Sequence, residues 1–289
     1  MSENPQKAGF IAVVGKPNAG KSSLLNWLVG EKMAMVSKKV NATRKRANII
    51  VMHNNTQFIF VDTPGIHVSE KLLNKIMIEE SLKAMSDCDL ILFLTPVTDS
   101  LQSYKDFLTS HNNKPHIVLL TKCDMVDNEK VLKKITEFEI YQSQFKALIP
   151  ISIKHYKSKM YLLNELEKFI PEHPYFYDPE LLTTQTMREI YKELIREAIY
   201  KFTSDEVPYS SDVVITKVEE KEKIDKIYAD IITEKEGQKN IIIGSGGETL
   251  KRIGIYSRKN IEKIINKQIF LKISVKNDKK WNKSAKNLV

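Results

Sequence analysis

The chain has 289 residues, 42% of them hydrophobic and 8% aromatic, so it is long enough for two ordinary cores and is not disordered by composition. Its two cysteines, Cys88 and Cys123, lack metal-ligand spacing, which excludes a disulfide scaffold or a zinc site and favours a reducing compartment. Because the sequence shows no secretory signal and no run of about 20 apolar residues, we expect a cytoplasmic protein.

The net charge of +9 is concentrated in one part of the chain. Residues 235–289 hold 14 Lys and Arg against 4 Asp and Glu, whereas the preceding residues hold 31 against 32. A basic segment beside a near-neutral one favours a polyanionic partner for the C-terminal part. A solvated, lysine-rich surface is the alternative on charge alone.

The first part of the chain alternates apolar runs with amphipathic stretches. Strands are predicted at 10–14, 49–52, 57–61, 90–94, 117–120 and 147–151, and helices at 21–29, 74–85, 103–110, 129–138 and 160–169. This alternation predicts an α/β fold with a mostly parallel sheet covered on both faces, in a domain of residues 1–172.

Three prolines between residues 171 and 179 interrupt this pattern, so a linker is predicted at 173–183. The rest, 184–289, reads as a small α+β domain. A long helix is predicted at 184–202, strands at 212–218 and 226–232, two short helical stretches on either side of 244–247, and a strand at 270–275.

A glycine-rich loop follows the first predicted strand. Its eight residues match G-x-x-x-x-G-K-[ST]: Gly15, Lys16, Pro17, Asn18, Ala19, Gly20, Lys21 and Ser22. Backbone N–H groups of such a loop wrap phosphate oxygens, and the following helix presents its positive end to the same anion. Lys21 is expected to neutralise the β- and γ-phosphates, and the Ser22 hydroxyl to bind Mg²⁺.

An acidic residue ends the third predicted strand. The stretch Asp62, Thr63, Pro64 and Gly65 follows an apolar run, so the Asp62 carboxylate can hold Mg²⁺ and the Gly65 N–H can reach the γ-phosphate. Thr43, in the polar segment 40–46, is the expected third metal contact beside Ser22 and Asp62. By themselves, the segment at Asp62 could be an ordinary turn and the segment 40–46 a plain surface loop.

A third motif predicts the base that is bound. Thr121, Lys122, Cys123 and Asp124 follow a buried strand, and the Asp124 carboxylate can accept two hydrogen bonds from guanine that adenine cannot donate. The commoner motif begins with Asn, so Thr121 retains a hydroxyl but loses an amide. Ser152 is expected to complete the base pocket, although Ile153 stands where a smaller residue is usual.

The residue after Gly65 is Ile66, which cannot orient a water molecule as a glutamine would. Hydrolysis of the bound GTP is therefore expected to be slow. It should depend on Mg²⁺, on backbone N–H groups and on Lys21, Thr43, Asp62 and Gly65. The side-chain oxygen of Asn18 could contribute to a K⁺ site at the phosphate loop.

A second glycine loop lies in the basic part of the chain. Gly244, Ser245, Gly246 and Gly247 form G-x-x-G between two helical stretches, and a basic group follows: Lys251, Arg252, Arg258 and Lys259. Such a loop lets an RNA backbone approach closely, and Ile253 with residues 241–243 is expected to line a groove for splayed bases. A helix–turn–helix connection capped by glycine is the alternative.

These stretches together resemble the Era family of bacterial GTPases over nearly the whole chain. The resemblance rests on GKPNAGKS, NATR, DTPG, TKCD and SIK, and then on EVPYSSDVVI, IIIGSGGETLKRIG and Trp281. It implies a Ras-like GTPase domain followed by a type II KH domain, with nucleotide contacts at 15–22, 62–66 and 122–124. Ser245 replaces a lysine that is frequent in the KH loop.

The resemblance also implies binding to 16S ribosomal RNA near its 3′ end and to the 30S subunit during maturation, with some peripheral association with the inner face of the cell membrane. From the four nucleotide motifs we expect GTP and GDP as ligands, and we expect a monomer. Two alternatives remain open: an RNA-binding assembly module with a vestigial GTPase, and a tRNA-modification or membrane-transport GTPase.

Overall fold

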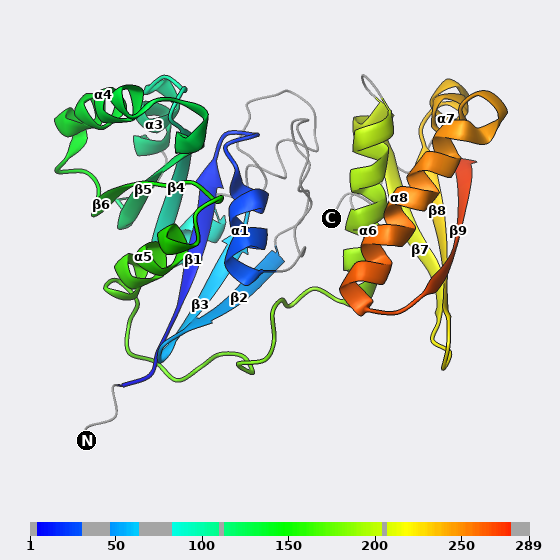
Figure 1. The fold of residues 1–289 in the computed structure, drawn as a ribbon, viewed down its shortest axis with the longest axis horizontal. Helices are drawn as coiled ribbons and strands as arrows, with labels where there is room; N and C mark the ends of the chain where they lie inside the picture. The colour runs from blue at the N-terminus through cyan, green and yellow to red at the C-terminus, as the bar shows by residue number, and fades with distance from the viewer. Residues whose placement is uncertain (1–4, 31–46, 64–82, 110–112, 204–206, 279–289) are drawn as a thin grey trace. The chain divides into compact units, whose positions relative to one another are not determined.

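The structure is a computed structural model that describes residues 5–30, 47–63, 83–109, 113–203 and 207–278 (Figure 1). The site predictions for Thr43, Pro64, Gly65 and Ile66 lie outside these residues, as does most of the helix predicted at 74–85. The chain divides into two compact units, the first containing the described residues up to Thr184 and the second those from Gln185 onward.

Unit 1 has the strand–helix alternation that the sequence predicts. Its elements, in chain order, are β1 (Lys7–Gly15), α1 (Lys21–Val29), β2 (Ala47–His53), β3 (Thr56–Asp62), β4 (Leu90–Pro96), α3 (Gln102–Leu108), β5 (His116–Thr121), α4 (Asn128–Phe138), β6 (Ala147–Pro150) and α5 (Tyr156–Glu167). Short 3₁₀ turns lie at η1 (Cys123–Met125) and η2 (Glu139–Tyr141).

The six strands form one sheet in the order β2-β3-β1-β4-β5-β6. The β2–β3 pair is antiparallel and the other pairs are parallel. All residues of β3, β4 and β5 are buried, because helices cover both faces of the sheet and no position of these strands is left facing water. The mostly parallel α/β fold predicted from the sequence is confirmed.

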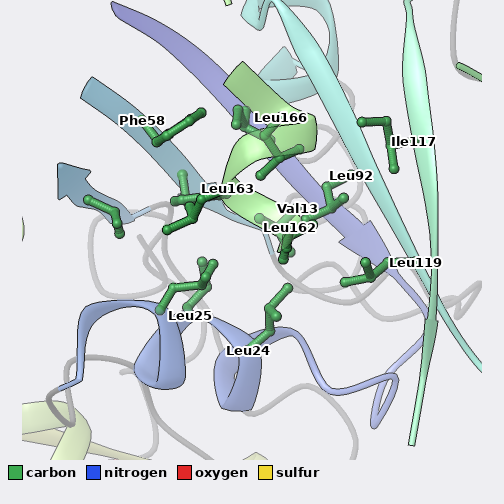
Figure 2. Close-up of a cluster of buried hydrophobic side chains, with 14 of the residues drawn as sticks. Val13, Leu24, Leu25, Phe58, Leu92, Ile117, Leu119, Leu162, Leu163 and Leu166 are labelled. Carbon is green, nitrogen blue, oxygen red and sulfur yellow. The ribbon is translucent and has the colours of Figure 1, made fainter. Parts of the chain in front are cut away.

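Two hydrophobic cores lie on the two faces of this sheet. One packs α1 and α5 against the strands, and Figure 2 shows Leu24 and Leu25 of α1 pointing toward Leu162 and Leu163 of α5, with Val13 of β1 beside Leu162. The other contains aromatic side chains of α3 and α4. Successive residues of β1 point to opposite faces of the sheet. Both faces of the strand are apolar because each packs into a different core.

The proline-rich segment after α5 has no long element of its own and lies along β2 and β3. The buried Gln57 amide accepts hydrogen bonds from the backbone N–H groups of Phe176 and Tyr177 and donates one to the Tyr177 carbonyl. Farther along, the Ile50 N–H donates to the Leu182 carbonyl at 2.9 Å. This segment is therefore fixed to unit 1 up to the point where the second unit begins.

Unit 2 has an α-β-β-α-α-β order. Its elements are α6 (Met187–Phe202), η3 (Val207–Ser210), β7 (Ser211–Glu219), β8 (Asp225–Thr233), α7 (Glu236–Ile243), η4 (Ser245–Gly247), α8 (Glu248–Ile265) and β9 (Ile269–Asn277). The sheet order is β7-β8-β9, with β7 antiparallel and β9 parallel to the central strand. The three helices pack on one face of this sheet (Figure 1).

Two predictions for unit 2 are wrong. The helix after the glycine loop has 18 residues and is not short, because Ile253, Ser257 and Ile261 recur on one buried face. For the same reason Ile253 does not line a groove: it and Ile242 are fully buried in the core beneath the helices. Of the predicted groove residues, only Ile241 has a large exposed fraction, at 50%.

A buried ion network joins α6 to the start of β7. The Arg196 guanidinium, 2% exposed, contacts the Glu193 carboxylate at 2.6 Å and Asp212 at 3.6 Å, and Lys192 contacts Asp212 at 2.8 Å. A charge as deeply buried as Arg196 is tolerated only with partners of opposite sign. The network gives a structural reason for Asp212 in the stretch EVPYSSDVVI.

Candidate functional site

The predicted nucleotide-binding motifs meet at one edge of the sheet of unit 1. Gly15 ends β1, Asp62 ends β3 and Thr121 ends β5, and β6 ends two residues before Ser152. Because these strands are parallel, their carboxyl ends lie at the same edge, and this is where open α/β sheets bind ligands.

The phosphate loop depends on glycine at two positions for different reasons. A Cβ at Gly15 would clash with the carbonyl oxygen of Leu94 on the adjacent strand and lie 3.3 Å from the Ala19 side chain. Gly20 has φ of +103° directly before the first turn of α1, a conformation that side chains rarely adopt. The backbone thus curls tightly and leads into a helix N-terminus, an arrangement suited to an anion.

Lys21 is held over this loop. Its ammonium donates hydrogen bonds to the carbonyls of Gly15 and Lys16, at 2.9 and 3.1 Å. Burial lowers the pKa of Lys21 to about 8, and the nearby Asp62 carboxylate partly opposes this shift. A buried ammonium that has lost most of its hydration gains strongly from a phosphate group placed beside it.

The residues for Mg²⁺ fit the requirements of that ion. The Asp62 side chain is 2% exposed at the end of β3, and Ser22 lies in the first turn of α1. Within the described residues, no group of three or more His, Cys, Asp or Glu side chains could form a cage of protein ligands. Mg²⁺ usually takes only one or two carboxylates and completes its shell with phosphates and water, so this donor set suits it.

The next residue fixes the end of β3. The buried Thr63 hydroxyl donates a hydrogen bond to the Val13 carbonyl of β1 at 2.6 Å. This bond sets the position of Asp62 relative to the phosphate loop.

Thr121 joins the base-reading segment to the phosphate loop. Its buried hydroxyl donates to the Ala19 carbonyl at 2.7 Å, across 102 residues of sequence. The hydroxyl therefore makes a tertiary contact that its position in the motif did not reveal. Lys122, which follows, has φ of +60° and turns the chain so that Asp124 comes back toward β6.

Asp124 and Ser152 lie together, as the sequence predicts for a guanine site. The Ser152 hydroxyl donates to one carboxylate oxygen at 3.0 Å, and Lys154 forms an ion pair with the other at 2.6 Å. The bonds from Lys154 and Ser152 hold the pKa of the Asp124 carboxyl below its usual range. Lys154 was missing from the predicted site, although a basic residue two positions after Ser152 was visible in the sequence.

The glycine loop of unit 2 connects α7 to α8. A Cβ at Gly244 would come within 2.8 Å of the Thr249 Cβ and 2.9 Å of its backbone nitrogen, so this glycine is required by packing. Gly246 and Gly247 also have positive φ, but a Cβ there would meet open space. The second half of the loop is therefore open to a ligand, and it leads directly into the N-terminus of α8.

The predicted basic residues share one face of α8. At 3.6 residues per turn, Lys251, Arg252, Arg258 and Lys259 lie opposite the buried Ile253 and Ile261, and all four are exposed. The Arg252 guanidinium stacks on the Phe202 ring at 4.7 Å, which fixes its position. A helix face of this kind, beside an open glycine loop, can follow a phosphate backbone.

The fold and these two sites define a P-loop GTPase joined to a KH domain. Residues 10–122 match the family described as 50S ribosome-binding GTPase, and residues 206–282 match the KH domain family. The chain belongs to the Era family of GTPases. It is 52% identical to GTPase Era of Campylobacter fetus over 276 residues, covering 96% of both chains, and 47% identical to GTPase Era of Helicobacter pylori over 98% of this chain and 95% of that protein.

Solved structures agree with this assignment. A single-residue variant of Aquifex aeolicus Era bound to GDP·AlF₄⁻ matches with a TM-score of 0.92 and 31% identity over 98% of both chains. Era in complex with MgGDPNP and nucleotides 1506–1542 of 16S ribosomal RNA matches with the same score and identity, over 98% of this chain and 97% of that one. The resemblance to Era and the expected GTPase activity are confirmed, and the fold is that of Era in both units.

Proposed function

We propose that this GTPase binds the 3′-terminal region of 16S ribosomal RNA through unit 2, under the control of GTP bound by unit 1, and assists maturation of the 30S subunit. The observation that carries the proposal is the match over nearly the full length to an Era structure that holds MgGDPNP and nucleotides 1506–1542 of 16S ribosomal RNA. Both units needed for such a complex are present in this chain.

In unit 1, we assign the phosphate contacts to residues 15–22, with Lys21 neutralising the β- and γ-phosphates. Asp124 reads guanine, and Ser152 and Lys154 hold its carboxylate in place. Thr121 keeps this segment against the phosphate loop. Its hydroxyl supports the proposal that guanine recognition survives without the usual asparagine.

For hydrolysis, Mg²⁺ held by Ser22, Asp62 and Thr43 would neutralise the charge on the transferring phosphoryl group. Lys21 and the Gly65 N–H complete the proposed stabilisation of that charge. Because Ile66 cannot orient water, we propose a slow intrinsic rate that a partner or a bound cation increases.

In unit 2, we propose that the RNA backbone crosses residues 244–247 and follows the basic face of α8. The open space at Gly246 and Gly247 supports close approach of a backbone, and the helix N-terminus and the four exposed cations of α8 favour phosphate. Ser245 supplies a hydroxyl where a lysine is frequent, so one phosphate contact is weaker.

The segment before unit 2 supplies a route for coupling. β2 begins directly after residues 31–46 and β3 ends at Asp62, so this hairpin joins the two segments expected to respond to the γ-phosphate. Gln57 and the backbone of Asn48 and Ile50 hold residues 176–184 along it. We propose that a shift of the hairpin on hydrolysis is passed through this segment to α6.

The test is multiple-turnover GTP hydrolysis with and without a 16S fragment corresponding to nucleotides 1506–1542, combined with RNA crosslinking of the GTP-analogue and GDP forms. We expect turnover that RNA changes, and crosslinks that differ between the two forms. Absence of turnover in both conditions would leave only an RNA-binding module. Crosslinking in cells to tRNA and not to 16S RNA would favour a tRNA-modification role.

Three further proposals concern the surroundings of the protein. We propose K⁺ near Asn18, tested by replacing K⁺ with Na⁺ in the hydrolysis assay. We also propose a monomer, tested by light scattering, and a peripheral association with the inner membrane surface, tested by sedimentation with anionic vesicles. None of the described helices combines the length and the apolar character needed to cross a bilayer.

A further inference from the structure

The sheet of unit 2 has a second face that the glycine loop and its helices do not use. Along β8, Ile227, Ala229 and Ile231 are buried on the side of the helices, so the alternate residues point the other way. Among the described elements, the helices of unit 2 that pack on this sheet all belong to the opposite side. We call the side that faces away from these helices the outer sheet face and define it by Lys217, Lys226, Tyr228, Phe270, Lys272 and Lys276.

Two aromatic rings lie next to each other on the outer sheet face. Strand register places Tyr228 between Lys217 of β7 and Lys272 of β9, and it places Phe270 beside Lys226. The Tyr228 and Phe270 rings contact each other with centroids 6.3 Å apart and planes at 63°. Phe270 remains 48% exposed, on a sheet whose other face forms the core.

The charge around these rings is positive. Four lysines share the outer sheet face with two carboxylates, since Lys217 pairs with Glu219 and Lys276 pairs with Asp230, each at 2.6 Å. Lys226 and Lys272 make up the excess, and each lies directly beside one of the rings, Lys226 beside Phe270 and Lys272 beside Tyr228. Lysine is depleted at the centre of protein–protein interfaces, whereas aromatic rings interleaved with lysine are suited to single-stranded nucleic acid.

We propose that the outer sheet face is a second RNA-binding surface, on which unpaired bases stack on Tyr228 and Phe270 while lysines neutralise the flanking phosphates. This inference rests on the proposed RNA binding by unit 2 and adds a surface to it. A G-x-x-G loop holds only about four nucleotides. An RNA that occupies both the glycine loop and the outer sheet face must therefore extend around the edge of the sheet, and only an RNA longer than this can do so.

Because only a longer RNA can reach both surfaces, the experiment compares RNAs of two lengths. The full chain with bound GTP analogue is tested with two RNAs: a single strand of about six nucleotides, enough for the glycine loop, and the 16S fragment corresponding to nucleotides 1506–1542. One variant combines Tyr228→Leu with Phe270→Leu, and another combines Lys226→Gln with Lys272→Gln. Ser274→Ala, on the same face but without a ring or charge, is the matched control, and Lys251→Gln with Lys259→Gln reports on the glycine-loop surface.

We expect the aromatic variant to weaken binding of the long RNA about tenfold and to leave binding of the short RNA unchanged. The reason is that each base stacked on a ring adds to the binding free energy, whatever the RNA sequence. The lysine variant should lower the salt dependence of long-RNA binding by about 1 to 2 in logarithmic slope. Ultraviolet crosslinking of the long RNA should mark peptides that contain Tyr228 or Phe270.

Wild-type affinity for the long RNA in both double variants, without crosslinks at these rings, would overturn the inference and leave the proposed function intact. If the wild-type protein bound neither RNA, the proposed function itself would fail. Should the aromatic variant lose both RNAs through misfolding, the lysine variant decides, because its side chains lie on the surface and outside the core.

Discussion

The two glycine loops of this chain have a similar backbone conformation but differ in how deeply the charged residues beside them are buried. Each has glycines at positive φ and leads into the N-terminus of a helix. In unit 1 the loop begins against the neighbouring strand at Leu94, with Lys21 and Asp62 almost fully buried beside it. In unit 2 the last two glycines face open space, and the cations of α8 are exposed.

This difference in burial separates two kinds of anion recognition. Buried charges interact strongly and with defined geometry, which suits a small ligand that must be bound in one orientation. Exposed lysines and arginines on a helix act through a screened field, which suits a long polyanion whose backbone passes over the surface. Substitutions at each loop should therefore separate the two functions, from the largest expected effect to the smallest.

Asp124→Asn should lower GDP affinity by about 100- to 1000-fold, because an amide group replaces one acceptor oxygen with a donor facing the guanine donors. Binding of a short RNA should be unchanged. Calorimetric titration with GDP measures the first effect. Asp127→Asn is the matched control, since Asp127 is an exposed helix cap that asparagine can replace. Equal losses in the two variants would contradict the assigned role of Asp124.

Gly244→Ala should destabilise unit 2 by about 3 kcal/mol, because the new Cβ meets Thr249 and the backbone has a positive φ. Gly246→Ala has only the conformational cost and should lose about 1 kcal/mol. Urea unfolding followed by circular dichroism measures both values. If the two variants lost equal stability, packing against Thr249 would not be what fixes Gly244.

Lys21 predicts a pH dependence of nucleotide binding. In the free protein burial lowers its pKa to about 8, and nucleotide phosphates should raise it again by favouring the charged form. Binding then takes up a proton above pH 8, so affinity should be constant below that value and fall as pH rises through it, by at most about tenfold per pH unit. Lys21→Arg stays protonated, so its affinity for GDP should be weaker but independent of pH between about 7 and 9.

The same lysine affects the stability of the nucleotide-free protein with the opposite sign. Its folded pKa is about 8 against 10.5 for the unfolded chain. Between these values the unfolded state binds more protons, so the contribution of Lys21 to stability rises with pH in this window. The free energy of unfolding of the wild type should be compared with that of Lys21→Arg across this pH window. A wild-type stability that falls relative to the variant as pH rises would contradict the lowered pKa of Lys21.

Lys251→Gln, alone and with Lys259→Gln, should have the smallest effects. Each exposed lysine should contribute a few-fold to RNA affinity and about 1 to the logarithmic slope against salt. GTP affinity should not change. Filter binding at several salt concentrations measures the slopes, and an unchanged slope in the double variant would exclude this face of α8 from the RNA contact.

Sequence patterns predicted most of the fold because each pattern has a local cause. The apolar runs at β1, β3, β4 and β5 predict buried strands, and the alternation with helices predicts a parallel sheet. The length of α8 was underestimated, since Gly254 and neighbouring polar residues weaken helix propensity, while burial of Ile253 and Ile261 in the core outweighs that cost.

The order of residue types along the chain predicts the chemistry of the nucleotide site. A glycine loop with Lys21 comes first, then a carboxylate at Asp62 and another at Asp124. These determine which ligand can be bound, because charge and hydrogen-bonding capacity belong to the side chain itself. Tertiary structure decided the rest. The bond from Thr121 to Ala19, the ion pair of Lys154 with Asp124 and the residues that share the outer sheet face of unit 2 depend on which strands lie side by side, and long-range packing decides which strands are neighbours.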